Sequence, residues 1–260
     1  MGQFAQRLNK NIGAYFGESI DLQQVLCDDL EAARKFGWQI EKLPVSASLD
    51  LFAFYRSINL PRKRLYISTG IHGDEPAGPL AVRQLLQENP WPNDLEIWLC
   101  PCLNPTGFPL NRRENVDGVD LNRDYRHLQS DEVCAHVAWL QRQPSFDLTL
   151  CLHEDWEARG FYLYELNRQH EPSPAEQVIE AVSKVCPIDL SSEIEGRPAQ
   201  GGIIRPDLDP TQRPEWPEAF YLIQHKTHHG FTLESPSDFL LETRVKALVT
   251  AVKTILQEHY

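Results

Sequence analysis

The stretch Leu65-Tyr66-Ile67-Ser68-Thr69-Gly70-Ile71-His72-Gly73-Asp74-Glu75-Pro76 joins an apolar run to a helical pattern over Ala77–Gln87. A second apolar run, Leu95–Leu99, follows that helix. Strand, helix and strand in this order indicate a largely parallel sheet covered on both faces, because such strands are hydrophobic throughout. The stretch therefore predicts an α/β fold, with His72 and Glu75 at the point where a strand runs into a helix.

The rest of the chain continues the alternation of helices and strands. Helical periodicity covers Ser19–Phe36, Asp131–Gln143, Pro174–Val185, Glu218–His228 and Asp238–Glu258, and strand patterns cover Trp38–Leu43, Leu51–Ile58, Asp147–Leu152, Gly160–Leu166 and Phe231–Leu233. The segment from Cys186 to Pro217 is rich in Pro and Gly and is predicted to be a surface loop. No internal repeat or low-complexity linker divides the chain, so we expect a single domain over residues 1–260.

The composition is that of an ordinary globular protein and makes some partners improbable. Of the 260 residues, 42% are hydrophobic and 24% are charged, and the formal net charge is -12. Nucleic acids and anionic membranes require a basic surface, so we expect neither as a partner. No run of about 18 apolar residues predicts a membrane span, and Met1–Lys10 lacks the apolar segment of a secretory signal. The six cysteines are scattered, so we expect reduced thiols and a cytoplasmic protein.

Polar side chains gather at the ends of several predicted strands and in the loops that follow them. They are His72 and Glu75, the loop residues Arg113, Asn122 and Arg123, then His153, and finally Glu234. In open α/β sheets, ligands bind outside the carboxyl ends of the strands. Imidazole nitrogen and carboxylate oxygen are zinc ligands, and a catalytic zinc site usually has three protein ligands. The pattern indicates a metal site in which His72 and Glu75 need a third ligand from elsewhere in the chain.

The order of these motifs resembles the zinc carboxypeptidases of the carboxypeptidase A type. The matching elements are H-x-x-E at His72, Asn104–Gly107, the stretch Arg113–Arg123, the strand ending on His153, and Phe231–Glu234. The resemblance spans Leu65–Ser235, and part of it is shared with the related succinylglutamate desuccinylase and aspartoacylase branch. It implies a single-domain, three-layer α/β fold with a mixed, mostly parallel twisted sheet and helices on both faces.

The resemblance also implies a role for each matched residue. His72, Glu75 and His153 would bind one zinc ion, Arg113 would polarise the scissile carbonyl, Asn122 and Arg123 would grip the substrate's terminal carboxylate, and Glu234 would act as general base. These roles suit the chemistry, because zinc polarises carbonyls and activates water, and guanidinium groups bind carboxylates through paired hydrogen bonds. Arg112 remains an alternative to Arg113.

Two acids depart from the carboxypeptidase pattern. His153 is followed by Glu154 and Asp155, where the digestive enzymes have Ser-Tyr. Beside a metal, these acids could repel an anionic substrate group, recruit a cationic one or bind a second metal ion. We expect one zinc ion per chain and regard a second site as the weaker hypothesis.

A tyrosine on a mobile loop of the carboxypeptidases has no secure counterpart. Tyr221 is the nearest candidate for this substrate-binding role, with Tyr162 and Tyr164 as alternatives. The second histidine cluster, His225, His228 and His229, is interpreted as an exposed helix end, where cationic side chains are favourable.

Three functions are compatible with these residues. We predict an enzyme, a zinc metallopeptidase of the carboxypeptidase type, which hydrolyses the amide bond next to a free carboxylate in a small peptide, including peptides of the cell wall. The alternative is a deacylase of N-acyl amino acids of the desuccinylase or aspartoacylase type. A third hypothesis is an inactive metal-binding scaffold, which the presence of both Glu234 and Arg113 disfavours. The sequence leaves the oligomeric state open.

Overall fold

The computed structural model describes residues 6–11, 17–59, 61–206, 209 and 212–259. The helices are α1 (Leu22–Lys35), α2 (Ala77–Glu88), α3 (Asp131–Arg142), α4 (Ala175–Ser183), α5 (Glu218–His225) and α6 (Leu241–His259), with short 3-10 turns η1 (Phe108–Leu110) and η2 (Leu121–Arg123). The strands are β1 (Gln39–Ser46), β2 (Leu49–Arg56), β3 (Lys63–Thr69), β4 (Leu95–Cys100), β5 (Leu148–Asp155), β6 (Tyr162–Asn167), β7 (Glu193–Ile194), β8 (Arg197–Pro198), β9 (Ile203–Ile204) and β10 (His229–Pro236).

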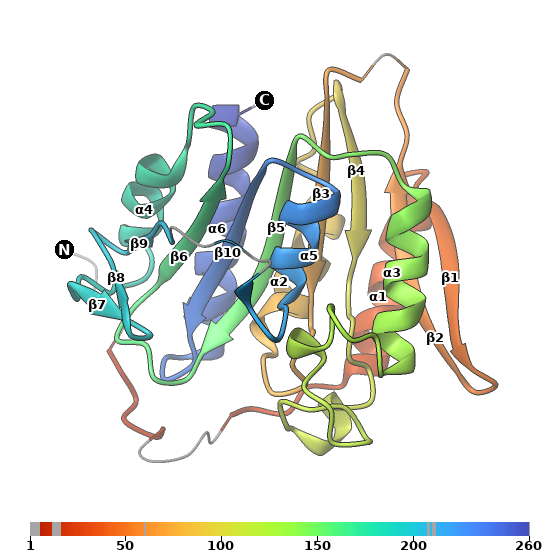
Figure 1. The fold of residues 1–260 in the computed structure, drawn as a ribbon, viewed down its shortest axis with the longest axis horizontal. Helices are drawn as coiled ribbons and strands as arrows, with labels where there is room; N and C mark the ends of the chain where they lie inside the picture. Colours follow the sequence, from red (N-terminus) through yellow and green to blue (C-terminus); the bar gives the residue numbers. More distant parts are fainter. Residues whose placement is uncertain (1–5, 12–16, 60, 207–208, 210–211, 260) are drawn as a thin grey trace.

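One mixed sheet of eight strands forms the middle layer, in the order β1-β2-β4-β3-β5-β10-β6-β9 (Figure 1). The central strands β4, β3, β5 and β10 run parallel to one another. Antiparallel pairing occurs toward the edges, between β1 and β2, between β2 and β4, and between β6 and β10. The predicted mixed, mostly parallel sheet is confirmed.

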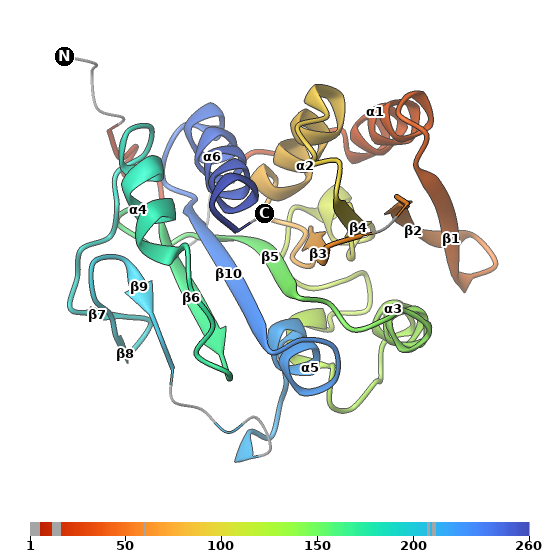
Figure 2. The ribbon, with the colours of Figure 1, turned by 90° about the horizontal axis from the view of Figure 1, so that it is seen from above.

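Helices cover both faces of this sheet. Helices α1, α2, α4 and α6 lie on one face, and α3 and α5 lie on the other (Figure 2). Every residue of β4 is buried, because a strand between two helical layers has no solvent-facing side. The predicted three-layer α/β architecture is therefore confirmed. None of the helices in the described part of the chain combines the length and the hydrophobicity needed to cross a membrane.

The carboxyl ends of β3, β5 and β10 meet at one edge of the sheet. Strands β5 and β10 run further than their hydrophobic patterns predict, so His153 and Glu234 lie within strands. The register pairs Glu234 with His153 on one side and with Tyr162 on the other. Side chains at paired positions project from the same face of a sheet. The three residues therefore form a row across β5, β10 and β6.

The prediction for the second histidine cluster is wrong for one of its members. Helix α5 ends at His225, and His229 is the first residue of β10. His229 is buried, and its Nε2 lies 2.9 Å from Glu165 Oε1. The strand begins before the apolar run at Phe231 because His229 already pairs with Asn167 of β6, and the Glu165 carboxylate gives the buried imidazole a partner.

The predicted surface loop between Cys186 and Pro217 contains short strands that periodicity does not reveal. Strands β7 and β8 form a small hairpin, and β9 adds to the edge of the main sheet beside β6. Two-residue strands have no measurable alternation, so only the folded partner strands define them.

Helix α1 carries a buried acid without a hydrogen-bond partner. Asp29 is fully buried, and neither of its carboxylate oxygens is hydrogen-bonded within the described part of the chain. Burial raises the pKa of Asp29 to about 8, and the charge of Arg83 only partly opposes this shift. The carboxyl is therefore protonated in the folded protein at neutral pH.

This shift predicts a loss of stability with rising pH. Because the folded-state pKa is raised, the stability is fully present below the unfolded-state pKa of about 4 and is lost as the pH rises through about 8. The Asp29→Asn variant should escape this loss, and its stability relative to wild type should improve by up to about 4 kcal/mol between pH ~5 and pH ~9. Urea unfolding of both proteins at both pH values measures this difference in the free energy of unfolding. Glu31→Gln, at an exposed position of the same helix, is the control. If the difference in stability between Asp29→Asn and wild type were the same at both pH values, the account would be contradicted.

Candidate metal centre and substrate pocket

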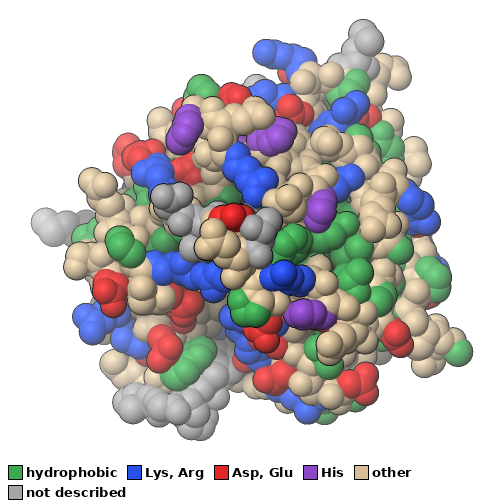
Figure 3. Space-filling view, viewed as in Figure 1, with side chains coloured by type: hydrophobic (Ala, Val, Ile, Leu, Met, Phe, Trp, Pro, Cys, Tyr) green, Lys and Arg blue, Asp and Glu red, His purple; other side chains and the backbone are tan. Residues whose placement is uncertain are grey.

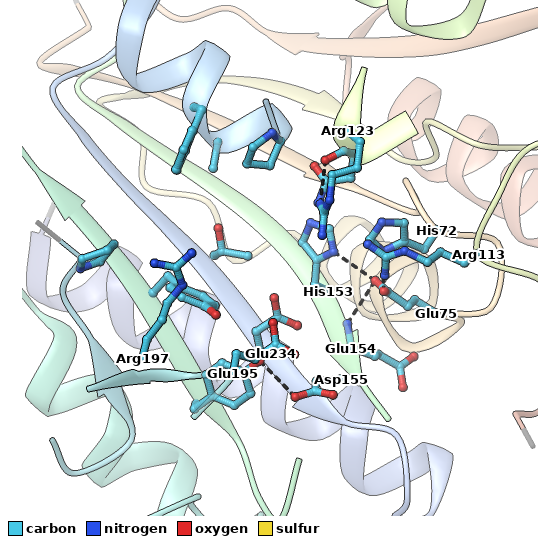
Figure 4. Close-up of a pocket in the computed structure, with 18 of the residues that line it drawn as sticks. His72, Glu75, Arg113, Arg123, His153, Glu154, Asp155, Glu195, Arg197 and Glu234 are labelled. Atoms are coloured by element: carbon cyan, nitrogen blue, oxygen red, sulfur yellow. Dashed lines mark hydrogen bonds and ion pairs between the residues drawn. The ribbon is translucent and has the colours of Figure 1, made fainter. Parts of the chain in front are cut away.

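Two residues close together in the sequence, His72 and Glu75, meet the distant His153 at the edge where β3 and β5 end (Figure 4). His72 and Glu75 lie between β3 and α2, and His153 lies on β5. His72 Nδ1 is 2.5 Å from Glu75 Oε1, and His153 Nδ1 is 3.1 Å from Glu75 Oε2. One ligand atom from each residue lies within 4.8 Å of the others, and all three residues are buried. Among the described residues, no other group of three or more His, Cys, Asp and Glu side chains gathers in this way.

A glycine allows the loop that carries His72 to pack closely. A Cβ atom on Gly73 would lie only 2.2 Å from the carbonyl carbon of Gly107. Any larger residue at position 73 would push the two loops apart, so glycine is needed for this backbone contact. The turn on the other side is fixed by Asn104, whose Oδ1 accepts the Gly107 N–H at 2.9 Å.

The electrostatics of the three residues fit a divalent cation. Burial alone would raise the pKa of Glu75, but the neighbouring His72 and His153 outweigh burial and hold its pKa below the ordinary value. Glu75 is thus an anion at neutral pH. Its two oxygens face two imidazole nitrogens, which is a zinc donor set of two His and one Glu. A zinc ion would replace the imidazole protons as the positive partner of Glu75.

A second carboxylate, which the sequence analysis missed, supports His72 from behind. Asp120 Oδ1 lies 3.4 Å from His72 Nε2, and Asp120 Oδ2 accepts a hydrogen bond from Arg113 Nε at 2.8 Å. A carboxylate on the outer nitrogen fixes the tautomer and the orientation of a metal-binding imidazole. The signal was present in the sequence, because Asp120 lies inside the stretch that was matched to the carboxypeptidases.

The two neighbouring arginines have different surroundings. Arg113 lines the pocket, and its Nη1 lies 3.4 Å from His72 Nδ1. Arg112 instead donates to the backbone carbonyl of Asn115, within its own loop. The geometry therefore favours Arg113 over Arg112 as the group that could reach a substrate.

Glu154 links β5 to two helices through its hydrogen bonds. Its backbone N–H donates to Glu75 Oε2 at 3.1 Å, and its carboxylate accepts the Ala77 N–H at 2.5 Å and Arg244 Nη1 at 2.6 Å. The Glu154 carboxylate turns away from Glu234 (Figure 4). Glu154 thus ties the first turn of α2 to β5. No sequence signal linked Arg244, in α6, to this position.

Glu234 and Asp155 form the acidic side of the pocket. Burial raises the pKa of Glu234 to about 8; the charge of His153 opposes this shift and that of Glu75 adds to it. Burial likewise raises the pKa of Asp155 to about 6. Asp155 Oδ2 accepts the Tyr162 hydroxyl at 3.0 Å. Without a metal ion, Glu234 is therefore mostly protonated at neutral pH, and Asp155 is engaged by a tyrosine. The positive charge of a zinc ion held by His72, Glu75 and His153 would lower the pKa of Glu234 and favour the carboxylate form, which can accept a proton.

A basic wall lines the pocket, from Arg123 beside His153 to Arg197 on the opposite side (Figure 4). We use this name for Arg123, Arg197 and Arg213, which line the pocket and pair with no carboxylate among the described residues. Burial, followed by the charges of Arg197 and Arg123, lowers the pKa of Arg213. The guanidinium groups are therefore close enough to repel one another, and an anion between them would relieve this repulsion. Arg197 reaches in from the side opposite His72 (Figure 4).

The pocket itself is a cavity of about 370 Å³. Asn122 lines it beside Arg123, as do Tyr162 and Tyr164. Tyr221 does not: its ring packs against Tyr125 and His225, with centroids 5.9 and 4.7 Å apart. Tyr221 does not reach the pocket because its position on α5 directs the side chain toward the core beneath α3.

The outer surface has no single sign of charge. On the face seen in Figure 3, acidic and basic side chains are interspersed, and histidines lie scattered between them. The arginines of the basic wall therefore belong to the pocket and not to a broad basic surface on that face.

Known proteins resemble this chain in sequence and in fold. Residues 61–197, just over half of the chain, match the model of the succinylglutamate desuccinylase/aspartoacylase catalytic domain. Carboxypeptidase SOL1 of Arabidopsis thaliana is 32% identical over an alignment of 111 residues, and the match covers 32% of this chain and 21% of that protein. The chain thus spans about a fifth of this curated relative.

Solved structures share the fold over almost the whole chain. A Shewanella denitrificans protein, named as a proposed metallopeptidase, has a TM-score of 0.78 at 23% identity and covers 95% of this chain and 98% of its own. A Pseudomonas aeruginosa metallo-carboxypeptidase, solved with (2-guanidinoethylmercapto)succinic acid, has a TM-score of 0.65 at 18% identity and covers 93% and 69%. The chain therefore belongs to the succinylglutamate desuccinylase/aspartoacylase family and has the fold of the zinc carboxypeptidase-like metallopeptidases.

Proposed function

We propose that this protein is a zinc-dependent hydrolase, in one catalytic domain, which cleaves the amide bond next to a free carboxylate in a small peptide. One observation carries the proposal: the buried group of His72, Glu75 and His153 shares a pocket with an acid of raised pKa, Glu234, and with guanidinium groups that pair with no carboxylate in the described part of the chain. These are the parts that metal-assisted hydrolysis of an anionic substrate requires. All six cysteines are free, which supports a reducing compartment such as the cytoplasm.

Each part has a task in the reaction. A zinc ion held by the three ligands would supply Lewis acidity toward the scissile carbonyl and toward water. Asn122 and Arg123 bind the substrate carboxylate, and this fixes the neighbouring amide in the pocket. Arg113 donates hydrogen bonds to the oxygen on which negative charge develops. Glu234 removes the proton from the attacking water and delivers it to the leaving nitrogen, so that the products are an acid and an amine.

A deacylase of N-acyl amino acids is the second candidate. The match to the desuccinylase/aspartoacylase model supports it, as does the basic wall, because Arg197 and Arg213 leave room for a second carboxylate on the leaving amino acid. Both candidates break the same kind of bond. They differ in the acyl group: an amino acid in a peptide, including a cell-wall peptide, or a simple acid in the deacylase substrate.

Zinc binding should depend on the three ligands. The purified protein should bind about one zinc ion per chain, and a free zinc concentration about a thousandfold above Kd should stabilise it by about 4 kcal/mol. His153→Ala should lose both the bound zinc and the stabilisation, because only two ligands remain. Elemental analysis and thermal unfolding with and without a chelator measure these effects. His228→Ala, which removes an exposed histidine, is the control; equal zinc content in His153→Ala would exclude the assignment.

Glu234 should be needed for turnover and not for zinc. Glu234→Gln should lower kcat by about 10²–10⁴-fold, the usual contribution of a positioned general base, with zinc content unchanged. Steady-state hydrolysis of dipeptides and N-acyl amino acids, with parallel zinc analysis, tests this. Glu242→Gln, at an exposed position of α6, is the control. A Glu234→Gln enzyme with wild-type kcat would show that another group is the base.

The basic wall should select acidic leaving groups. Arg197→Gln should reduce the ratio of kcat/KM for a substrate that releases glutamate to that for one that releases leucine, by about tenfold, because a charge-assisted hydrogen bond is lost. Paired peptide and N-acetyl substrates measure the ratio and also decide between the two candidates. Arg205→Gln is the control, since Arg205 pairs with Glu165 and Glu176 and does not line the pocket. An unaltered ratio in Arg197→Gln would remove Arg197 from substrate selection.

A further inference from the structure

The first residue of α5 is a buried acid that the proposed reaction does not use. Glu218 is 1% exposed, and it has no ion-pair partner among the described residues. Its Oε1 accepts the Tyr66 hydroxyl at 2.7 Å, and its Oε2 accepts the Ser68 hydroxyl at 2.8 Å. Burial raises the pKa of Glu218, and these two hydrogen bonds oppose the rise. A buried carboxylate without a cation is costly, so its place in the fold calls for a reason.

The hydrogen bonds of Glu218 continue into the core as a chain. His136 Nε2 lies 2.9 Å from the Tyr66 hydroxyl, and His136 Nδ1 lies 2.7 Å from the Tyr125 hydroxyl. Burial lowers the pKa of His136 to about 3, so the imidazole is neutral. With Glu218 ionised, Tyr66 donates its proton to the carboxylate and accepts from His136 Nε2–H, and His136 Nδ1 then accepts from Tyr125. In this arrangement, each hydroxyl and each ring nitrogen of the hydrogen-bond network has a hydrogen-bond partner.

The backbone of Glu218 connects this core network to the pocket. Pro217 precedes α5 and offers no side-chain cap, so the first N–H groups of the helix need other acceptors. The Glu218 N–H donates to Asn122 Oδ1 at 2.9 Å. This bond engages the oxygen of the Asn122 amide. Its NH₂ group is therefore the end that remains for the pocket, which Asn122 lines beside Arg123.

One residue thus holds two parts of the molecule in a fixed relation. The side chain of Glu218 fastens the start of α5 to β3, and its backbone N–H sets the direction of the Asn122 amide. The next residues, Ala219 and Phe220, line the pocket. Phe220 also supports Arg213, whose guanidinium lies 5.7 Å from the centre of the ring. A movement of Glu218 would therefore change the positions of Asn122, Ala219 and Phe220, at the end of the pocket that is proposed to bind the carboxylate.

We propose that Glu218 is a positioning residue for carboxylate recognition, which acts through Asn122 by presenting the Asn122 NH₂ group to the substrate's terminal carboxylate. This inference rests on the proposed function, because it assumes that a carboxylate binds at Asn122 and Arg123. It adds a buried hydrogen-bond network, Tyr125–His136–Tyr66–Glu218, to the proposed site. This network should affect KM only for substrates that have a free terminal carboxylate.

A double-mutant cycle with Glu218→Gln and Asn122→Ala tests the proposal on the zinc-loaded full chain. Glu218→Gln should raise KM for a dipeptide with a free terminal carboxylate by about tenfold, the value of one well-oriented hydrogen bond, and leave kcat within about threefold. KM for the matching dipeptide amide should stay constant. In the Asn122→Ala background, Glu218→Gln should add nothing further, because the two residues act as a unit. Glu193→Gln, at an exposed position of β7, controls for the lost charge.

Other outcomes overturn the inference. Fully additive effects on KM, or equal effects on the acid and the amide, would mean that Glu218 acts only on general stability. Tyr66→Phe is the second variant if Glu218→Gln does not fold: it removes one hydrogen bond to Glu218 and should show the same selective rise in KM, whereas an unchanged KM would contradict the proposal. If the wild-type protein hydrolyses no substrate, the proposed function fails. The inference is then decided by calorimetric titration with succinate, which Glu218→Gln should weaken only while Asn122 is present.

Discussion

The carboxylate of Glu75 lies between two buried imidazoles, and this shared contact decides how the carboxyl edge of the sheet is built. It requires β3 and β5 to be parallel neighbours, because His72 and His153 then leave the sheet at the same edge. Helix α2 begins at Ala77, two residues after Glu75, so the crossover connection from β3 carries both His72 and Glu75. A buried anion is tolerated only where its partners are fixed in place. The sheet and the crossover helix satisfy that condition together.

Two further carboxylates, those of Asp120 and Glu154, hold His72, Glu75 and His153 in place. Asp120 lies against the outer nitrogen of His72, and Glu154 joins β5, α2 and α6 through its hydrogen bonds. Outer groups of this kind orient metal ligands and raise their basicity. The pocket also carries both signs of charge, because the acids Glu75 and Glu234 and the arginines of the basic wall all line it. Under the proposed function, a substrate carboxylate bound by Arg123 would hold the neighbouring amide beside the candidate metal site.

The sequence predicted the features that are encoded locally. Strand, helix and strand around His72 and Glu75 defined the α/β fold, and the position of His153 at the end of an apolar run placed it at the same edge as His72. The residues that were missed contribute through tertiary contacts. Arg244 lies 90 residues beyond Glu154, and the pairing of Glu218 with Asn122 spans 96 residues, so no spacing could have indicated either. Tyr221 was placed by motif order, but the rotation of α5 turns it into the core.

The region between Cys186 and Pro217 was the least predictable for a physical reason. Its strands are two residues long, and they are defined by their partners and not by hydrophobic alternation. This region nevertheless supplies Arg197 and Arg213, two of the three arginines of the basic wall. The candidate site therefore combines a candidate metal site that the local sequence predicts with a basic wall that becomes apparent only in the folded chain.

Anomalous X-ray diffraction at the zinc absorption edge, on crystals of the zinc-loaded protein, tests the central claim most directly. The account predicts one strong peak about 2 Å from the Nδ1 atoms of His72 and His153 and from the carboxylate of Glu75. Absence of a peak there, or a peak held by other residues with His153 turned away, would contradict it.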